Sequence, residues 1–435
     1  MTATSVRTQW HHAATIALLV AWGPLFRALL DKGWMHQGGL NLVGQWAQLQ
    51  GMSELVSAPA MAGIGVGLTV LTAQRDRSQN LPLLYCAALV CALITAPLLL
   101  SVWLWPSHIG SWLHLDVSLH HWLGWVATSG WLGMVWGLLA SYGLGQHAQG
   151  RVLMLSLATG LPTLIALLLT MVAGAHPDDA LGAVILTGVV VGSAGALGGW
   201  VHGLLWWRRT PHAWQKLRAV LRPVLRYTPA GIAVGLLTPL SVLAIRSSMA
   251  QHMDWEAAGT ATALWRASDW VLSVAAGLLY YHHLPQLSRH VTEGRLASQL
   301  PVVLRQILWP SAVALVLLWS MQGWLLPPLY DQRMQVSPIA SAAFWAGDFM
   351  RVVSAVFLFA LYALHASKAI AWGEWLSQPL LASLLMLGAA HSLLWTGLAH
   401  WATYVVYAAF NAGAVWWNIR GSISFQLQDK QTVHR

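Results

Sequence analysis

Long apolar stretches of about twenty residues recur along this sequence, separated by short polar segments. About 20 apolar residues in a helix cross the hydrocarbon core of a bilayer, because a helix rises 1.5 Å per residue and the core is about 30 Å thick. Only 9% of the 435 residues are charged, whereas soluble domains devote about a quarter of their residues to charged side chains. The sequence therefore predicts an all-α membrane protein.

The apolar stretches predict twelve spans, and their approximate boundaries are 12–30, 41–71, 82–105, 120–142, 152–173, 180–205, 226–245, 257–284, 302–325, 337–365, 373–391 and 393–417. The second, eighth and tenth of these exceed the length that a bilayer requires. We expect those three helices to tilt or to project from the membrane.

Basic residues are distributed unevenly between the two sides of these spans. With the N-terminus in the cytoplasm, seventeen of the 23 Lys and Arg residues fall on the cytoplasmic side, whereas the opposite loops hold only Lys32, Arg246 and Arg333. This bias predicts that both termini are cytoplasmic. It also explains the net charge of +9 by attraction to anionic lipid headgroups, so no nucleic-acid partner is expected.

The longest polar stretch divides the chain into two halves of six spans each. We predict an N-terminal bundle over 1–207, a linker over 208–225, a C-terminal bundle over 226–418 and a cytoplasmic tail over 419–435. Both halves enter the membrane from the same side, so a pseudo-twofold axis along the membrane normal can relate them.

The linker has the pattern of an amphipathic helix. Its apolar residues recur at helical spacing, and they are Leu217, Val220, Leu221 and Val224. The basic residues between them are Lys216, Arg218 and Arg222. This pattern predicts a helix that lies on the cytoplasmic leaflet.

The 28 Trp residues indicate aromatic belts at the headgroup level, because an indole combines an apolar body with one polar N–H group. Several stand at span ends, namely Trp103, Trp105, Trp206, Trp207, Trp416 and Trp417. Stacking of Trp on sugar rings is the alternative interpretation. Cys86 and Cys91 fall within one span, so we expect neither a disulfide nor a metal site, and no cofactor.

Ionisable residues inside the spans are the candidate functional residues, because a charge near the bilayer centre costs at least about 2.5–3.5 kcal/mol. Arg266 and Asp269 stand three residues apart on the eighth span, and Asp348 and Arg351 repeat that spacing on the tenth. Each pair lies on one helical face and can bridge internally. The two pairs are either locks between helices or the lining of a hydrated cavity.

Glu54 is the only carboxylate well inside a span in the first half of the chain. We expect it to have no sequence-local partner. We interpret it as a site of proton or cation coupling, and the alternative is a hydrogen-bonded structural acid. Glu374 begins the eleventh span, where we expect its side chain to reach the membrane interface.

Several segments resemble the signature of Wzx-type O-antigen and enterobacterial common antigen translocases. The most specific are Trp255–Gly259 (WEAAG), Ala263–Asp269 (ALWRASD) and Tyr280–Ser288 (YYHHLPQLS). Further agreement lies at Gly44–Trp46, at Gly63 and Gly67, and at Trp345–Val352 (WAGDFMRV). Such proteins belong to the multidrug/oligosaccharidyl-lipid/polysaccharide (MOP) exporter superfamily. The resemblance implies a MATE-like fold, in which two six-helix bundles surround a central cavity.

The resemblance also implies a function and a location. It implies a flippase in the bacterial inner membrane, which moves undecaprenyl-pyrophosphate-linked oligosaccharide from the cytoplasmic to the periplasmic leaflet by alternating access. Its pathway would be O-antigen or lipopolysaccharide biosynthesis, with a polysaccharide polymerase and a chain-length regulator as partners. A proton or sodium gradient would drive it, since no Walker motif occurs.

In that function Arg266, Arg351 and Arg27 would meet the pyrophosphate, because the planar guanidinium matches phosphate geometry. Asp269 and Asp348 would line the same cavity, and Glu54 would couple the ion. Arg27 has an alternative role, which is to extend its guanidinium to the outer interface.

Under this interpretation the protein is a transporter and not an enzyme. Two other functions compete with it. A polymerase or ligase of the same glycan pathway would need a catalytic cluster in an outer loop. The largest such loop, 106–119, offers only His108, His114 and Asp116. A multidrug exporter of the same superfamily would suit a Trp-rich interior, but the segments quoted above argue against it.

Overall fold

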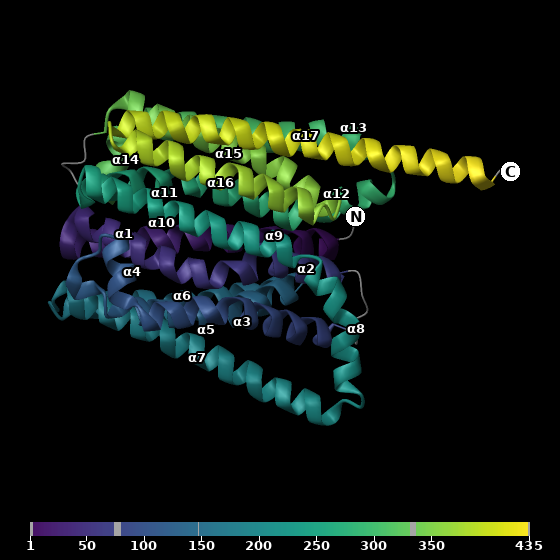
Figure 1. Cartoon of the computed structure of the whole chain (residues 1–435), viewed down its shortest axis with the longest axis horizontal. Helices are drawn as coiled ribbons and strands as arrows, with labels where there is room; N and C mark the ends of the chain where they lie inside the picture. Colours follow the sequence, from purple (N-terminus) through teal and green to yellow (C-terminus); the bar gives the residue numbers. More distant parts are fainter. Residues whose placement is uncertain (1–2, 74–79, 147, 331–335, 434–435) are drawn as a thin grey trace. The chain divides into compact units, whose positions relative to one another are not determined.

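The computed structural model describes residues 3–73, 80–146, 148–330 and 336–433, and these residues form helices joined by short turns (Figure 1). They divide into two compact units. Unit 1 comprises residues 1–262 with 329–331, and unit 2 comprises 263–328 with 332–435. The predicted all-α class is confirmed, while the division into two six-span bundles stays a prediction.

Unit 1 contains the helices up to the start of α11. They are α1 (Ala3–Pro59), η1 (Ala60–Gly65), α2 (Val66–Ala73), α3 (Leu81–Leu104), α4 (Pro106–Trp112), η3 (Val117–Leu119), α5 (Trp122–Gly145), α6 (Gln149–Val172), α7 (Pro177–Arg209), α8 (Ala213–Leu225), α9 (Thr228–Ile232), η4 (Ala233–Leu237) and α10 (Thr238–His252).

Helix α11 (Trp255–Leu278) begins in unit 1 and continues into unit 2. The helices that follow it are η5 (Leu279–His283), α12 (Leu284–Thr292), α13 (Leu296–Ser320), α14 (Gln322–Leu329), α15 (Pro338–Ala363), α16 (Ser367–Ala389) and α17 (Leu393–Val433). At 1.5 Å per residue, the 41 residues of α17 extend about 60 Å. Its C-terminal part accordingly runs past the ends of α15 and α16 in Figure 1.

Each of the twelve predicted spans overlaps one or more of these helices. The first two overlap α1, which is two helices joined at Gly39, where the backbone has a φ of 71°. Seven helices in the described part of the chain are long and apolar enough to cross a membrane. An eighth is added if α1 and α2, bent by 50°, count as one broken span.

The other predicted spans coincide with α11, α16 and α17, which are less apolar. Several polar side chains on these helices are buried within the protein instead of facing outward. Glu374 and Gln378 of α16 are examples, as are His400 and Asn411 of α17. A count of membrane spans by apolarity alone therefore misses helices whose polar side chains face one another.

Glycines allow the closest helix contacts in unit 1. A Cβ atom at Gly259 would collide with the carbonyl oxygen of Leu40, and one at Gly63 would collide with the backbone of Gly231. Helices in membranes approach most closely where such small residues face each other. Two glycines singled out by the sequence resemblance thus have a packing role.

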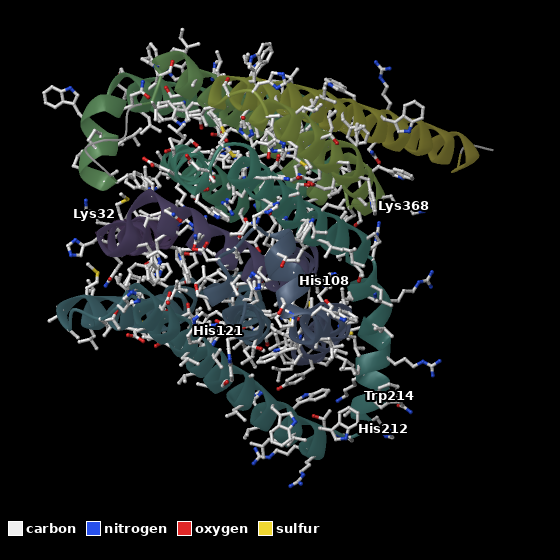
Figure 2. The ribbon with its side chains drawn as sticks, turned by 60° about the vertical axis from the view of Figure 1, so that its left-hand side comes forward. Lys32, His108, His121, His212, Trp214 and Lys368 are labelled. Carbon is white, nitrogen blue, oxygen red and sulfur yellow. The ribbon has the colours of Figure 1, made fainter. Side chains whose placement is uncertain are left out.

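The predicted amphipathic linker is helix α8. Its buried side chains, Leu217, Val220 and Val224, pack with Leu83 and other residues at the start of α3. Its basic side chains are exposed, as is Leu221, which the pattern had placed on the apolar face. In Figure 1, α8 crosses the ends of α3 and α7. Figure 2 shows His212 and Trp214 at its start.

The loops that define the topology lie at opposite ends of α3. Helix α8 packs on the first turns of α3, whereas residues 106–119 follow its last turn. Arg246, which we expected in an outer loop, lies instead within α10 and donates a hydrogen bond to the carbonyl oxygen of Ala47 (2.9 Å). Arg333 lies outside the described residues.

Reporter fusions test the predicted orientation. A fusion after Trp207 should be cytoplasmic, because the six basic residues of 208–226 resist translocation. A fusion within 106–119 should be periplasmic. Paired alkaline phosphatase and fluorescent-protein fusions at both points provide the measurement, and the reverse pattern would overturn the orientation.

Candidate functional site

A fully buried carboxylate, that of Asp348 on α15, is the centre of a polar network in unit 2. Ser268 on α11 donates its hydroxyl hydrogen to Oδ2 (2.6 Å). Nε2 of His400 on α17 lies 3.1 Å from Oδ1. An ionised carboxylate only accepts hydrogen bonds, so Nε2 carries the hydrogen in this arrangement. Asp348 therefore joins three helices.

Arg351, one turn after Asp348, extends the network to a second carboxylate. Its Nη1 donates to Oδ1 of Asp269 on α11 (3.3 Å) and lies 3.9 Å from Oδ1 of Asp348. The guanidinium carbon also lies 5.9 Å from the centroid of the Tyr404 ring, within the range of a cation–π interaction. The Arg351 side chain is 38% exposed and that of Asp348 only 1%. Arg351 is thus the member of this ion pair that a ligand can reach.

Local sequence explains why these helices meet. A Cβ atom at Gly347 would collide with the His400 ring, so the glycine lets α17 approach α15 beside Asp348. Trp345 donates its indole N–H to the carbonyl oxygen of Leu264 on α11 (3.3 Å). The segment Trp345–Arg351 therefore fastens α15 to both α11 and α17.

A second buried acid lies in the same unit. Glu374 on α16 is 3% exposed, accepts a hydrogen bond from the Tyr407 hydroxyl and accepts another from Nε2 of Gln378 (3.0 Å). Asn411 donates to the hydroxyl of Ser354 (2.9 Å). Our expectation that Glu374 reaches the membrane interface is wrong, because its carboxylate is held inside the helix bundle.

The four charged residues predicted in unit 2 lie in one region of α11 and α15. The internal bridge between Asp348 and Arg351 is present, and Asp269 pairs with Arg351 across the two helices. Arg266 is 8% exposed and lies one turn before Asp269. Two cations and two carboxylates balance, as buried charges in a membrane require.

The other two predicted residues belong to unit 1. The Glu54 side chain on α1 is exposed, and Nε2 of Gln50 donates to its Oε1 (3.4 Å). The expectation that Glu54 has no sequence-local partner is wrong, because Gln50 stands one turn earlier on α1. Arg27 is exposed on α1 as well. The coupling role of Glu54 and the two roles considered for Arg27 stay predictions.

The polar residues of α17 were not identified as site residues from the sequence. His400, Thr403, Tyr407 and Asn411 are all buried. Their spacing of three or four residues places them on one face of the helix. That polar stripe within an otherwise apolar span is the signal that could have found them. Among the described residues, no cluster of His, Cys, Asp and Glu could hold a metal ion.

No family model matches the sequence, and no curated protein shows significant sequence similarity to it. Solved structures do match the fold over nearly the whole chain. The MATE transporter VcmN of Vibrio cholerae, solved as a point mutant, matches with a TM-score of 0.66 at 14% identity, over 95% of this chain and 98% of that one. The chain has a MATE-like fold.

Two further structures have this MATE-like fold. An inward-facing multidrug resistance MATE transporter of the MOP superfamily matches with a TM-score of 0.63 at 11% identity, over 91% of this chain and 96% of that one. The lipid II flippase MurJ, in an inward closed conformation, matches with a TM-score of 0.62 at 11% identity, over 94% and 87%. These proteins are transporters, not enzymes. At such identities the likeness establishes a multi-pass membrane fold and leaves the cargo undetermined.

The hydrogen bond from Ser268 to Asp348 should contribute measurably to the stability of this MATE-like fold. We expect Ser268→Ala to lower the free energy of unfolding by about 1.5–3 kcal/mol, because the acceptor is a buried charge. The matched control is Ser298→Ala on α13, whose exposed hydroxyl bonds only to the Arg295 carbonyl. Thermal unfolding of both purified variants in one detergent is the measurement, and equal effects would show that the network does not stabilise unit 2.

Proposed function

We propose that this protein is a flippase for undecaprenyl-pyrophosphate-linked oligosaccharide. In this proposal it transfers repeat units from the cytoplasmic to the periplasmic leaflet of a bacterial inner membrane by alternating access. Both termini are cytoplasmic, and a polysaccharide polymerase and a chain-length regulator of the same pathway receive the product. The MATE-like fold supports transport as the general activity.

One observation supports a lipid-linked glycan as the cargo. Two of the sequence segments that resemble Wzx-type translocases, around 264–269 and 345–351, contact each other directly. They do so through the Trp345 indole, through Ser268 with Asp348, and through Asp269 with Arg351. The residues of the resemblance thus form one charged network.

The chemistry of the cargo suits this network. A pyrophosphate head cannot cross hydrocarbon unaided, so its carrier must offer a hydrated, partly cationic path while the prenyl tail stays in lipid. Arg351 is partly exposed and already holds a carboxylate, that of Asp269. A pyrophosphate oxygen can replace that carboxylate as its partner, because guanidinium binds both through paired hydrogen bonds. Arg266, one turn before Asp269 on α11, supplies a second cation.

Coupling to a proton or sodium gradient is the second part of the proposal, with Glu54 as the coupling residue. Its carboxylate is exposed and hydrogen-bonded to Gln50, so it can exchange a proton or a cation with water. An intramembrane carboxylate in an accessible position is a common site of such coupling.

A drug exporter is the competing function, because two of the matched structures are MATE transporters named for multidrug resistance. MurJ matches with a similar TM-score, so the fold does not separate the two. The polymerase or ligase alternative would rest on Asp116, whose side chain is exposed and accepts a hydrogen bond from Gln45 (2.7 Å).

Deletion of the gene should leave lipid-linked repeat units on the cytoplasmic leaflet. Surface glycan should be lost, while sensitivity to aromatic cations should not change. The orientation of the lipid-linked units in spheroplasts and the drug susceptibility of the same strain are the two measurements. Normal outer-leaflet delivery, in a strain without another flippase, would rule out the proposal, and drug hypersensitivity alone would favour the exporter.

Substitutions at Arg351 separate ligand binding from structural locking. Arg351→Lys keeps the charge but loses the planar fork, so export should fall at least about tenfold, the loss expected from one charge-assisted hydrogen bond of about 1.5–3 kcal/mol. Arg351→Ala should abolish export. Complementation of glycan export, normalised to membrane-inserted protein, provides the readout, and Arg266 is tested by the same two substitutions.

The control for these variants is Arg305→Lys, because Arg305 is exposed on α13 and has no part in the network. A purely structural lock predicts instead that Arg351→Ala lowers membrane insertion together with export, because the carboxylates of Asp269 and Asp348 lose the guanidinium beside them. Export at the wild-type level by a well-inserted Arg351→Ala protein would eliminate the binding role.

A further inference from the structure

Unit 1 contains a cavity of about 370 Å³ between α1, α5, α6 and α7. Both halves of α1 contribute to it, with Trp22 before Gly39 and Trp46 after it. Its volume falls within the range of small-molecule sites, about 300–1,000 Å³. All of its lining residues belong to unit 1.

The lining of this cavity is aromatic and uncharged. Three indoles, those of Trp22, Trp46 and Trp136, face it, and none of the described lining residues is Asp, Glu, Lys, Arg or His. Two of the indoles are fixed by hydrogen bonds, Trp22 to the Ser156 carbonyl oxygen (3.1 Å) and Trp136 to that of Val191 (3.0 Å). Their rings are therefore held in place before any ligand arrives.

Helix α6 adds a row of hydroxyl groups to the cavity wall, from Ser156, Thr159 and Thr163. Each donates its hydrogen to a carbonyl oxygen one turn earlier on α6. A hydroxyl that has donated its hydrogen presents acceptor lone pairs. The row thus offers acceptors to a ligand that brings its own O–H donors.

We propose that this cavity binds an uncharged sugar residue of the carried oligosaccharide, an inference that rests on the proposed function and specifies its substrate. Pyranose rings have apolar C–H faces that stack on indoles and hydroxyl groups that donate to acceptor oxygens. An anionic sugar would find no cation here, and a cationic drug would find no carboxylate. The alternative interpretation of Trp residues as sugar-stacking groups therefore applies to these three.

A glycine in the cavity wall allows a test that leaves the other contacts intact. A Cβ atom added at Gly133, which lines the cavity, meets no heavy atom within 4 Å. A side chain at this position starts in open space, so Gly133→Leu should fill part of the cavity and abolish sugar binding. The matched control is Gly198→Leu on α7, where a Cβ is equally unobstructed but lies outside the cavity lining.

A second pair of variants removes one acceptor without filling the cavity. Thr163→Val keeps the side-chain shape and loses the hydroxyl, so the apparent affinity for the sugar should fall about 3- to 10-fold, the loss expected for one neutral hydrogen bond. Its control is Thr170→Val on the same helix. Thr170 also bonds to its own helix (2.8 Å to the Leu167 carbonyl oxygen) but does not line the cavity.

The measurement is thermal stabilisation of the full chain in lipid nanodiscs free of glycoside detergents, which would themselves compete. The probes are methyl glycosides of neutral hexoses and of N-acetylhexosamines, with a methyl glucuronide and ethidium as charged comparisons. We expect saturable stabilisation by at least one neutral glycoside and by neither charged compound. The effect should persist in both controls and vanish in Gly133→Leu.

Stabilisation by no neutral glycoside, or an undiminished response in Gly133→Leu, overturns the inference. Stabilisation by ethidium through the same cavity instead supports the drug exporter. Because the assay measures binding of a free sugar, it is independent of flipping. A protein that flips the lipid-linked glycan but binds no neutral glycoside contradicts only the cavity assignment, whereas sugar binding without flipping contradicts only the flippase.

Discussion

The buried carboxylate of Asp348 is the feature on which unit 2 depends. A charge inside a membrane protein persists only when other groups of the protein compensate it. Here the compensation comes from Ser268 on α11, His400 on α17 and Arg351 on its own helix. These partners come from separate helices, so the contact fixes how α11, α15 and α17 pack. It also holds Arg351 where its guanidinium is partly exposed.

Much of this arrangement could be predicted from the sequence, because apolar length and charge are local properties. The twelve apolar stretches overlap the observed helices, and the spacing of Asp348 and Arg351 predicted their bridge. The pairing of Asp269 with Arg351 could not be predicted, since the two residues stand 82 positions apart in the chain and only packing brings them together. Glu374 was misjudged for the same reason, because its partner Tyr407 lies on another helix. Gln50 was not identified as the partner of Glu54, because its amide is neutral and we expected partners from charge alone.

The two units differ in the chemistry that they offer a ligand. Unit 2 presents a balanced set of cations and carboxylates, and the cavity of unit 1 presents indoles and hydroxyl oxygens without charge. A lipid-linked oligosaccharide has the same two parts, an anionic pyrophosphate and largely neutral sugars. Drug exporters and a lipid flippase share the MATE-like fold, so the side chains that line each site must select the cargo. We therefore assign cargo specificity to these lining residues and not to the MATE-like fold.

Reconstitution of the purified protein tests directly whether it flips the lipid-linked oligosaccharide. Undecaprenyl-pyrophosphate oligosaccharide is placed in both leaflets of sealed proteoliposomes, and a glycosidase that cannot cross the membrane is added outside. We expect wild-type protein to expose the inner-leaflet pool to digestion. Vesicles with Arg351→Ala protein, and vesicles without protein, should expose only the outer-leaflet pool. Digestion limited to the outer-leaflet pool with correctly inserted wild-type protein, under an imposed proton or sodium gradient of either direction, would contradict the flippase proposal.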